Sequence, residues 1–283
     1  MPRTRAGEWL LRTFVRPPYQ DETGAKGRFA RFARAQPHVI RRFAITMPGW
    51  PARPLRIAFL SDFHLGSHEN DVARLDAIIA EAASFKPHLV LHGGDFVNMQ
   101  PFGGGRIPPR TIAAVLARLK APLGRFAVLG NHDYTYGADD VAAALQAHDI
   151  TVLRDQRRTL HHDAHEIDLI GLPDARNLRP AGQALLAGLP SGRPTIVLAH
   201  DPFWFAHVPA GPHLTLAGHT HGGQIRFPLV GALRNASHAP LRWSHGHIVE
   251  QDRHLYVTGG LGTSAVPLRI GMPPEYAVID IGG

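Results

Sequence analysis

Five segments of the sequence place Asp, Asn or His directly after a short apolar run. Each run predicts a buried strand, and sites in α/β proteins assemble at the carboxyl ends of strands. One such pattern alone is typical of a turn or of a hydrogen-bonded core histidine, but five together favour one polar site. The apolar runs and the residues that follow them are 57–61 before Asp62 and His64, 89–91 before His92-Gly93-Gly94-Asp95, 126–129 before Gly130-Asn131-His132-Asp133, 195–199 before His200, and 214–217 before Gly218-His219-Thr220-His221.

The chemistry of these side chains is that of ligands for divalent transition metals. The 283-residue chain contains no cysteine, which excludes disulfides, Cys-ligated zinc, iron–sulfur clusters and a thiol nucleophile. A metal must therefore be held by His, Asp, Glu, Asn or water, and Zn, Mn, Fe and Mg all suit such ligands. Most of the 19 histidines match no pattern, and we expect His161, His162 and His165 to lie in a surface loop.

From residue 54 onward, short apolar segments alternate with amphipathic ones, which is typical of an α/β domain. The amphipathic spacing predicts helices over residues 72–84, 109–119, 139–147 and 182–187. Further strands are predicted over residues 151–153, 166–171, 253–258 and 276–281. Because helices become rare in the second half, two mixed β-sheets packed together fit the pattern better than one parallel sheet.

The ordered series Asp-x-His, Gly-Gly-Asp, Gly-Asn-His-Asp, His and Gly-His-x-His resembles the calcineurin-like metallophosphoesterases over residues 55–281. This resemblance implies a four-layer sandwich of two mixed β-sheets flanked by helices. The run Gly-His-Thr-His-Gly-Gly-Gln-Ile at 218–225 and the closing segments 262–264, 267–269 and 273–275 are similar to a bacterial branch of the family. Members of that branch are proposed to act on phospholipid-like or nucleotide-lipid substrates, and a related activity is UDP-2,3-diacylglucosamine diphosphatase.

The resemblance also implies a role for each motif residue. Asp95 would bridge two divalent metal ions (Mn2+, Fe2+/Fe3+ or Zn2+), because two cations about 3.5–4 Å apart require an anion between them. The other implied ligands are Asp62, His64 and His221 for one metal, and Asn131, His200 and His219 for the other. A hydroxide bridging the metals would be the nucleophile. His132 would be the general acid, and Asp133, at a position where the family usually has Glu, would orient His132 and favour its protonated form.

The positive charge of the chain is concentrated at its beginning. Residues 1–53 contain eleven Lys and Arg against three Asp and Glu, a net charge of +8, whereas residues 54–283 have a net charge of −1. We therefore expect a basic N-terminal arm over residues 1–53 and a metallophosphoesterase domain over residues 54–283. No apolar run is long enough for a signal peptide or a membrane-spanning helix, which predicts a cytoplasmic protein.

Basic residues in the arm are interleaved with bulky apolar ones. This composition suits an interfacial helix on anionic lipid, and it predicts peripheral contact with the inner membrane through residues 1–45. The alternative is a solvated arm whose aromatic side chains pack back onto the domain. No nucleic-acid-binding motif is present, so no specific nucleic-acid partner is expected.

These patterns together predict metal-dependent hydrolysis of a phosphodiester or pyrophosphate bond. The predicted substrate is a phosphorylated small molecule or lipid, with a lipid-linked substrate at the membrane surface as the first choice. Two alternatives stay open, a soluble nucleotide phosphodiesterase and a non-catalytic metal-binding scaffold, although the complete ligand set and His132 argue against the scaffold. The sequence leaves the oligomeric state open.

Overall fold

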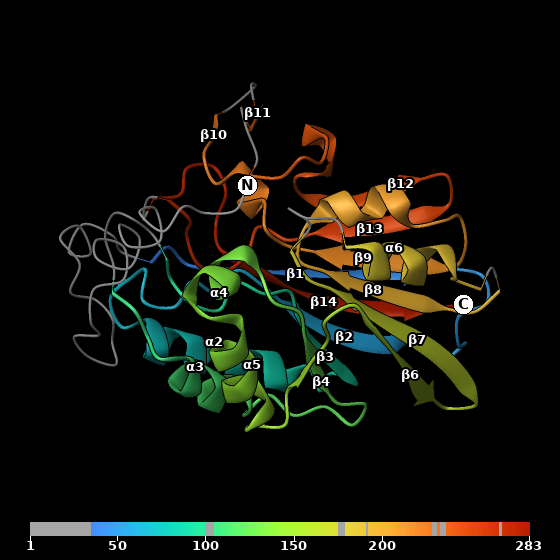
Figure 1. The fold of residues 1–283 in the computed structure, drawn as a ribbon, viewed down its shortest axis with the longest axis horizontal. Coiled ribbons are helices and arrows are strands. Elements are labelled where there is room, and N and C mark those ends of the chain that lie inside the picture. Colours follow the sequence, from blue (N-terminus) through green and yellow to red (C-terminus); the bar gives the residue numbers. More distant parts are fainter. Residues whose placement is uncertain are drawn as a thin grey trace.

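Two six-stranded mixed β-sheets packed face to face, with helices on both outer sides, form the body of the protein (Figure 1). A computed structural model describes residues 35–99, 105–174, 179–190, 192–227, 231–232, 236–265 and 268–283. This α/β architecture is the one predicted from the sequence. Within the described ranges, no helix combines the length and the apolar character that crossing a bilayer requires.

The first sheet has the strand order β1-β14-β2-β3-β4-β5. From β2 to β5 the strands are parallel, β14 runs antiparallel to β2, and β1 runs parallel to β14. Its strands are β1 (Val39–Thr46), β2 (Leu55–Leu60), β3 (Leu89–His92), β4 (Arg125–Ala127), β5 (Thr151–Val152) and β14 (Glu275–Gly282). The helices that follow β2, β3 and β4 are α2 (Asp71–Ser84), α3 (Pro109–Leu116), α4 (Asn131–Tyr136) and α5 (Ala138–Gln146).

The second sheet has the strand order β12-β13-β9-β8-β7-β6, with parallel strands at its centre and an antiparallel strand at each edge. Its strands are β6 (Gln156–His162), β7 (His165–Leu172), β8 (Thr195–Ala199), β9 (His213–Ala217), β12 (Gly246–Glu250) and β13 (Arg253–Val257). The remaining elements are α6 (Pro180–Ala187), the short 3-10 helices η3 (Pro202–His207), η4 (His221–Gly223) and η5 (Leu241–Trp243), and the hairpin of β10 (Arg226–Phe227) and β11 (Gly231–Ala232).

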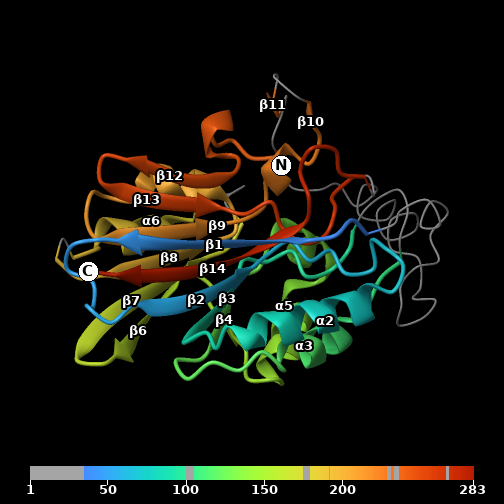
Figure 2. The same ribbon diagram turned by 180° about the vertical axis from the view of Figure 1, so that it is seen from behind.

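Three apolar clusters separate the four layers. On β3, Val90 packs toward the helices, while Leu89 and Leu91 pack between the sheets, as the two-residue period of a strand requires. The third cluster joins the second sheet to Leu186 of α6 and Trp204 of η3. Figure 2 shows α2, α3 and α5 along the first sheet, and Figure 1 shows α6 in front of the second.

The predicted boundary between an arm and a domain at residues 53 and 54 is not where the sheet begins. Residues Val39–Thr46, expected in the arm, form edge strand β1, which pairs with β14 along its full length. Phe43 and Ile45 alternate along this strand and pack between the sheets, but the adjacent Arg41 and Arg42 obscured that period. The part of the predicted membrane-binding segment from residue 39 to 45 is thus a strand, and residues 1–34 lie outside the described residues.

The expected surface loop at His161, His162 and His165 is also wrong. His161 and His162 end β6, and His165 begins β7. Only Asp163 and Ala164 separate the two antiparallel strands, and Asp163 has a positive φ of 52°. A two-residue hairpin turn needs such a conformation, so the polar run is a strand, a tight turn and a strand.

Candidate metal centre

The seven predicted ligands meet at one end of the sandwich, where both sheets contribute loops. Asp62, Asp95 and Asn131 follow β2, β3 and β4 of the first sheet, while His200 and His219 follow β8 and β9 of the second. His64 and His221 each lie two residues farther along. All seven side chains are buried. The site is therefore built across the two sheets, at the carboxyl ends of five strands.

His200 and His219 turn ring nitrogens toward one another and toward Asn131. Nδ1 of His200 lies 2.7 Å from the carbonyl oxygen of Gly93, and Nε2 of His219 lies 3.2 Å from that of Ala236. A carbonyl only accepts, so these two nitrogens carry protons, and in the neutral ring that binds a metal the other nitrogen of each histidine carries the lone pair. The two lone-pair nitrogens are 3.1 Å apart, and Nε2 of His200 is 3.3 Å from Oδ1 of Asn131. Three lone-pair donors that converge in this way fit a cation.

A second convergence lies on the other side of the site. Nε2 of His64 is 3.1 Å from Nε2 of His221, which is 3.6 Å from Oδ1 of Asp62. These three residues form one of the groups whose ligand atoms are close enough together to hold a metal ion. The guanidinium of Arg269 lies behind this group, 3.2 Å from Nδ1 of His221.

Asp95 lies between the two convergences. Its Oδ2 is 3.5 Å from Nε2 of His64 and 3.5 Å from Nε2 of His200. Its Oδ1 accepts a hydrogen bond of 2.8 Å from the backbone N–H of His132. One carboxylate is thus equidistant from both groups, which is the position that an anionic bridge between two cations requires. The residues present fit a pair of divalent metal ions.

The backbone at the site is held in an uncommon conformation. Positive φ angles occur at five of the seven residues, namely Asp62 (53°), His64 (40°), Asp95 (54°), His219 (67°) and His221 (51°). Non-glycine residues rarely adopt this region, and such strain concentrates at functional sites. Gly130 allows the closest approach, because a Cβ there would lie 2.1 Å from Oδ1 of Asp95.

Burial dominates the electrostatics of the site. It raises the pKa of Asp62, and it raises that of Asp95 well above the usual range, where the nearby Asp133 and Asp62 act in the same direction. Burial lowers the pKa of His64 and of His221, assisted by neighbouring cationic groups, so both rings favour the neutral form that binds metals. For His200, burial lowers the pKa, but Asp95, Asp62 and Asp174 outweigh it and raise the pKa to about 9.

His132 and Asp133 have different environments. The His132 ring meets the His64 ring edge to face with centroids 4.5 Å apart, so it borders the site. The Asp133 carboxylate accepts hydrogen bonds from the backbone N–H groups of Gly130, Asp95 and Phe96, each at 2.9 Å. Burial raises the pKa of Asp133 to about 6 despite these hydrogen bonds. This carboxylate ties the loop after β3 to the start of α4, and its orientation of His132 stays a prediction.

Sequence reasoning did not identify Arg269 as a site residue, although it lies in the segment 267–269 that resembles a bacterial branch of the family. Its side chain is 4% exposed and donates to the carbonyl oxygens of Gly259 (2.7 Å) and Gly262 (2.9 Å) as well as contacting His221. A single Arg in a Pro-rich segment gives no signal of this contact. Asp201, which follows ligand candidate His200, accepts from the backbone N–H of Phe203 at the start of η3 and lies 3.8 Å from Nε2 of His219.

Known proteins are similar in sequence to this chain. The sequence model of the calcineurin-like phosphoesterase family matches residues 55–223. The uncharacterized protein YpbG of Bacillus subtilis is 30% identical over 242 residues, covering 84% of this chain and 84% of its own. Phosphodiesterase YaeI of Escherichia coli is 32% identical over 241 residues, covering 81% of this chain and 83% of its own.

Among solved structures, the NAD nucleotidase of Haemophilus influenzae aligns with a TM-score of 0.48 at 15% identity, over 75% of this chain and 45% of that one. The family model covers more than half of the present sequence, and YaeI matches most of it above 30% identity. The chain therefore belongs to the calcineurin-like phosphoesterase family and is a metal-dependent phosphoester hydrolase.

Proposed function

We propose that this protein hydrolyses a phosphodiester or pyrophosphate bond with two divalent metal ions bound at the site described above. The observation that carries this proposal is the position of Asp95, equidistant at 3.5 Å from His64 and His200. The proposed ligands are Asp62, His64, Asp95 and His221 for one ion, and Asp95, Asn131, His200 and His219 for the other.

Bound metal ions would supply Lewis acidity toward the phosphoryl oxygens and a water of lowered pKa. The chain supplies the rest. His132 follows ligand Asn131 and borders His64, so it can give a proton to the leaving oxygen. Arg269 holds the loop carbonyl oxygens of Gly259 and Gly262 beside His221. Asp133 ties the backbone on either side of Asp95 to the loop that carries Asn131 and His132.

For the substrate, we propose a lipid-linked phosphodiester or pyrophosphate at the cytoplasmic surface of the inner membrane. The basic segment 1–34 supports this choice, since it contains eight Lys and Arg but only three Asp and Glu. The similarity to YaeI, which is named a phosphodiesterase, supports a diester more generally. A soluble nucleotide diester is the competing substrate. A screen of UDP-diacylglucosamine, glycerophosphodiesters and cyclic nucleotides, with metal analysis of the purified protein, decides between them.

The test of the reaction is the turnover of bis-p-nitrophenyl phosphate with Mn2+ by His132→Ala. We expect a loss of about 100-fold or more, because a positioned general acid typically contributes about 10²–10⁴-fold, with the metal content unchanged. His161→Ala, at an exposed position at the end of β6, is the matched control. Negligible turnover by the wild-type protein with its metal bound would favour a non-catalytic scaffold.

A further inference from the structure

Three exposed apolar side chains gather on two short segments beside the candidate metal centre. Among the described residues, large apolar side chains are exposed at five positions, including Phe227 (47%), Leu268 (49%) and Ile270 (40%). The other two, Leu241 and Val249, belong to η5 and β12. Such residues are unremarkable singly, so their clustering on adjoining segments is what requires an explanation.

The two segments are joined to one another through their backbones. Ile225 and Ile270 form a parallel β-bridge, with hydrogen bonds from Arg226 N–H to Ile270 O (2.8 Å) and from Ile270 N–H to Gln224 O (3.1 Å). Figures 1 and 2 both show β10 projecting from the body next to the chain that leads into β14. Phe227, Leu268 and Ile270 are thus exposed on two segments that are hydrogen-bonded to each other, and we call these three side chains the apolar rim.

The apolar rim is connected directly to the metal centre. Leu268 and Ile270 flank Arg269, and because an extended chain alternates its faces, their side chains are exposed while Arg269 is 4% exposed and reaches His221. On the other segment, Phe227 follows His221 by six residues. A surface that contacts the rim would lie near the metal centre.

The basic N-terminal segment joins the body at the same place. The side-chain amide of Gln36 donates a hydrogen bond of 2.9 Å to the carbonyl oxygen of Arg269. Residues 1–34, with a net charge of +5, thus connect to the described body beside the apolar rim. An apolar rim next to a basic segment complements a surface that is anionic at its face and apolar beneath, which is the character of an anionic lipid bilayer.

We infer that Phe227, Leu268 and Ile270 insert into an anionic lipid surface and hold the metal centre at that surface. The inference rests on the proposed membrane location of the substrate and specifies how the site reaches it. A second copy of the chain fits less well, because a stable protein interface buries about 1,200–2,000 Å², whereas the rim consists of three side chains on narrow segments.

The experiment measures sedimentation of the full-length protein with vesicles of phosphatidylcholine containing phosphatidylglycerol. The test variant is Phe227→Ser/Leu268→Ser/Ile270→Ser. Its matched control, Leu241→Ser/Val249→Ser, removes side chains that are 49% and 54% exposed elsewhere on the protein. We expect the triple variant to bind vesicles at least tenfold more weakly and the control to bind like wild type. Thermal unfolding checks that each variant is folded.

The salt dependence of vesicle binding distinguishes the contribution of the apolar rim from that of the basic segment. Screening weakens the attraction of exposed charges but not apolar insertion, so deletion of residues 1–35 should weaken binding mainly at low salt, and the triple variant at high salt as well. Wild-type binding by the triple variant at high salt would overturn the inference. So would a wild-type dimer that the triple variant dissociates without any change in vesicle binding.

Turnover of bis-p-nitrophenyl phosphate by wild-type protein tests the proposed function separately, since this ester is soluble. Rim-dependent vesicle binding without turnover would leave the docking surface standing and remove the proposed hydrolysis. Turnover without rim-dependent vesicle binding would support the proposed hydrolysis and remove the docking surface.

Discussion

Two buried polar clusters contact the loop of residues 258–262, and they differ in how their charges are balanced. On one side is the candidate metal centre, whose Asp62 contacts this loop through the hydrogen bond from Gly262 N–H to Asp62 O. On the other side is Glu275, at the start of β14. Both contain carboxylates with less than 2% of their surface exposed, so burial alone does not distinguish them.

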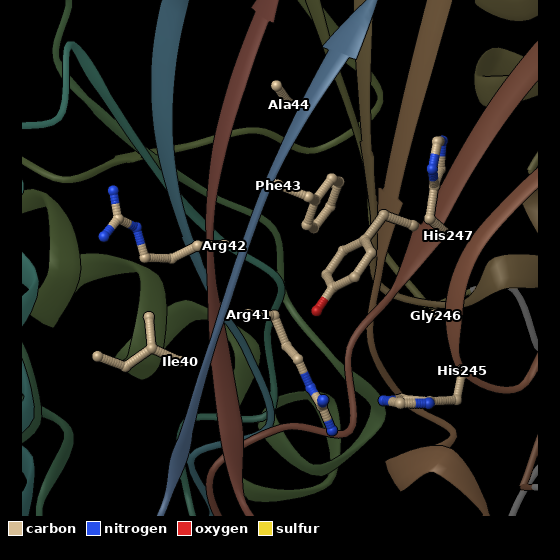
Figure 3. Close-up of a pocket in the computed structure, with 9 residues that line it drawn as sticks. Ile40, Arg41, Arg42, Phe43, Ala44, His245, Gly246 and His247 are labelled. Atoms are coloured by element: carbon tan, nitrogen blue, oxygen red, sulfur yellow. The ribbon is translucent and has the colours of Figure 1, made fainter.

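Glu275 is surrounded by donors that the protein itself provides. Its carboxylate accepts from Arg41 Nε (2.7 Å) and the backbone N–H of Gly259 (2.9 Å), and it pairs with His245 Nε2 at 2.8 Å. Although burial raises its pKa, these partners outweigh burial and lower the pKa of Glu275 to about 2. Figure 3 shows Arg41 and His245 pointing toward each other across a groove of about 470 Å³ between β1 and the β12–β13 hairpin.

In the metal centre, by contrast, groups that can bind a metal ion face one another. The pKa of Asp95 is raised rather than lowered, and Nε2 of His200 and Nδ1 of His219 are 3.1 Å apart. The difference indicates how to recognise a site that awaits a cation. A structural cluster is satisfied by the protein's own donors, whereas a metal centre is a buried set of acceptors that only an added cation balances.

The largest expected effect follows from Asp95→Asn. We expect turnover of bis-p-nitrophenyl phosphate to fall on the order of 1,000-fold, about 4 kcal/mol of activation free energy, because the anionic bridge is lost. In the metal-free protein the same change should raise the unfolding temperature, since it removes a buried charge next to other carboxylates. Calorimetry with a chelator measures this. Destabilisation of the metal-free protein would mean that the Asp95 carboxylate stabilises the fold as Glu275 does, and the proposed difference between the two clusters would be wrong.

Glu275→Gln should have the opposite effect on stability. Lowering the pKa from 4.5 to about 2 corresponds to about 3 kcal/mol at neutral pH. Because the folded pKa is lowered, this stabilisation is complete above pH 4.5 and disappears as the pH falls toward 2. Urea unfolding of wild type and variant should therefore differ by about 3 kcal/mol at pH 7, and the two should converge near pH 2. A constant difference across that range would show that the charge of Glu275 is not what stabilises the fold.

The two clusters also differ in how well the sequence predicts them. Asp62, Asp95 and His200 follow apolar runs at strand ends, so local pattern and strand topology were enough to bring them together. The fold class followed from the same alternation of elements. Strand boundaries and the edge strand β1 were less accessible, because Arg41 interrupts the apolar period of β1 in order to pair with Glu275 across 234 positions.

The roles of Asp133 and Arg269 were beyond sequence reasoning for a related reason. Asp133 bonds to backbone N–H groups, and backbone donors have no identity in a sequence. Arg269 reaches His221 and the carbonyl oxygens of the loop after β13, a contact that depends on how the segment before β14 folds back. Neither contact has a spacing that a motif could display.

A smaller effect is expected from Arg269→Lys. This variant tests whether the buried guanidinium next to His221 contributes to metal affinity. Lys keeps the charge but cannot contact His221 and the loop carbonyls in the same geometry. We expect metal affinity to fall about 10–100-fold, as for other groups that orient a ligand, measured by titration of metal-free protein with Mn2+. The matched control is Arg74→Lys, because Arg74 donates to the loop carbonyl of Leu261 but to Asp71 rather than to a ligand. Equal losses in both variants would indicate a general effect on the loop.

His92 is a third kind of buried polar group, and it gives the smallest effect at neutral pH. Neither of its ring nitrogens has a hydrogen-bond partner among the described residues, and its ring lies against Phe63 and Phe96. Burial, with a smaller contribution from Arg125, lowers the pKa of His92 to about 3. The folded protein therefore keeps the ring neutral while the unfolded chain protonates it, so stability is full above pH 6.5 and is lost as the pH falls.

The variant His92→Leu should remove this loss. The wild-type protein should lose about 2 kcal/mol between pH 7 and pH 5 through this residue, whereas the variant should lose correspondingly less and should match wild type within about 1 kcal/mol at pH 7, as for substitutions of similar volume. Urea unfolding at the two pH values measures the difference. Identical pH dependence of stability in both proteins would mean that protonated His92 gains a hydrogen-bond partner as the pH falls. His92 would then be a polar group that the protein satisfies, as Glu275 is.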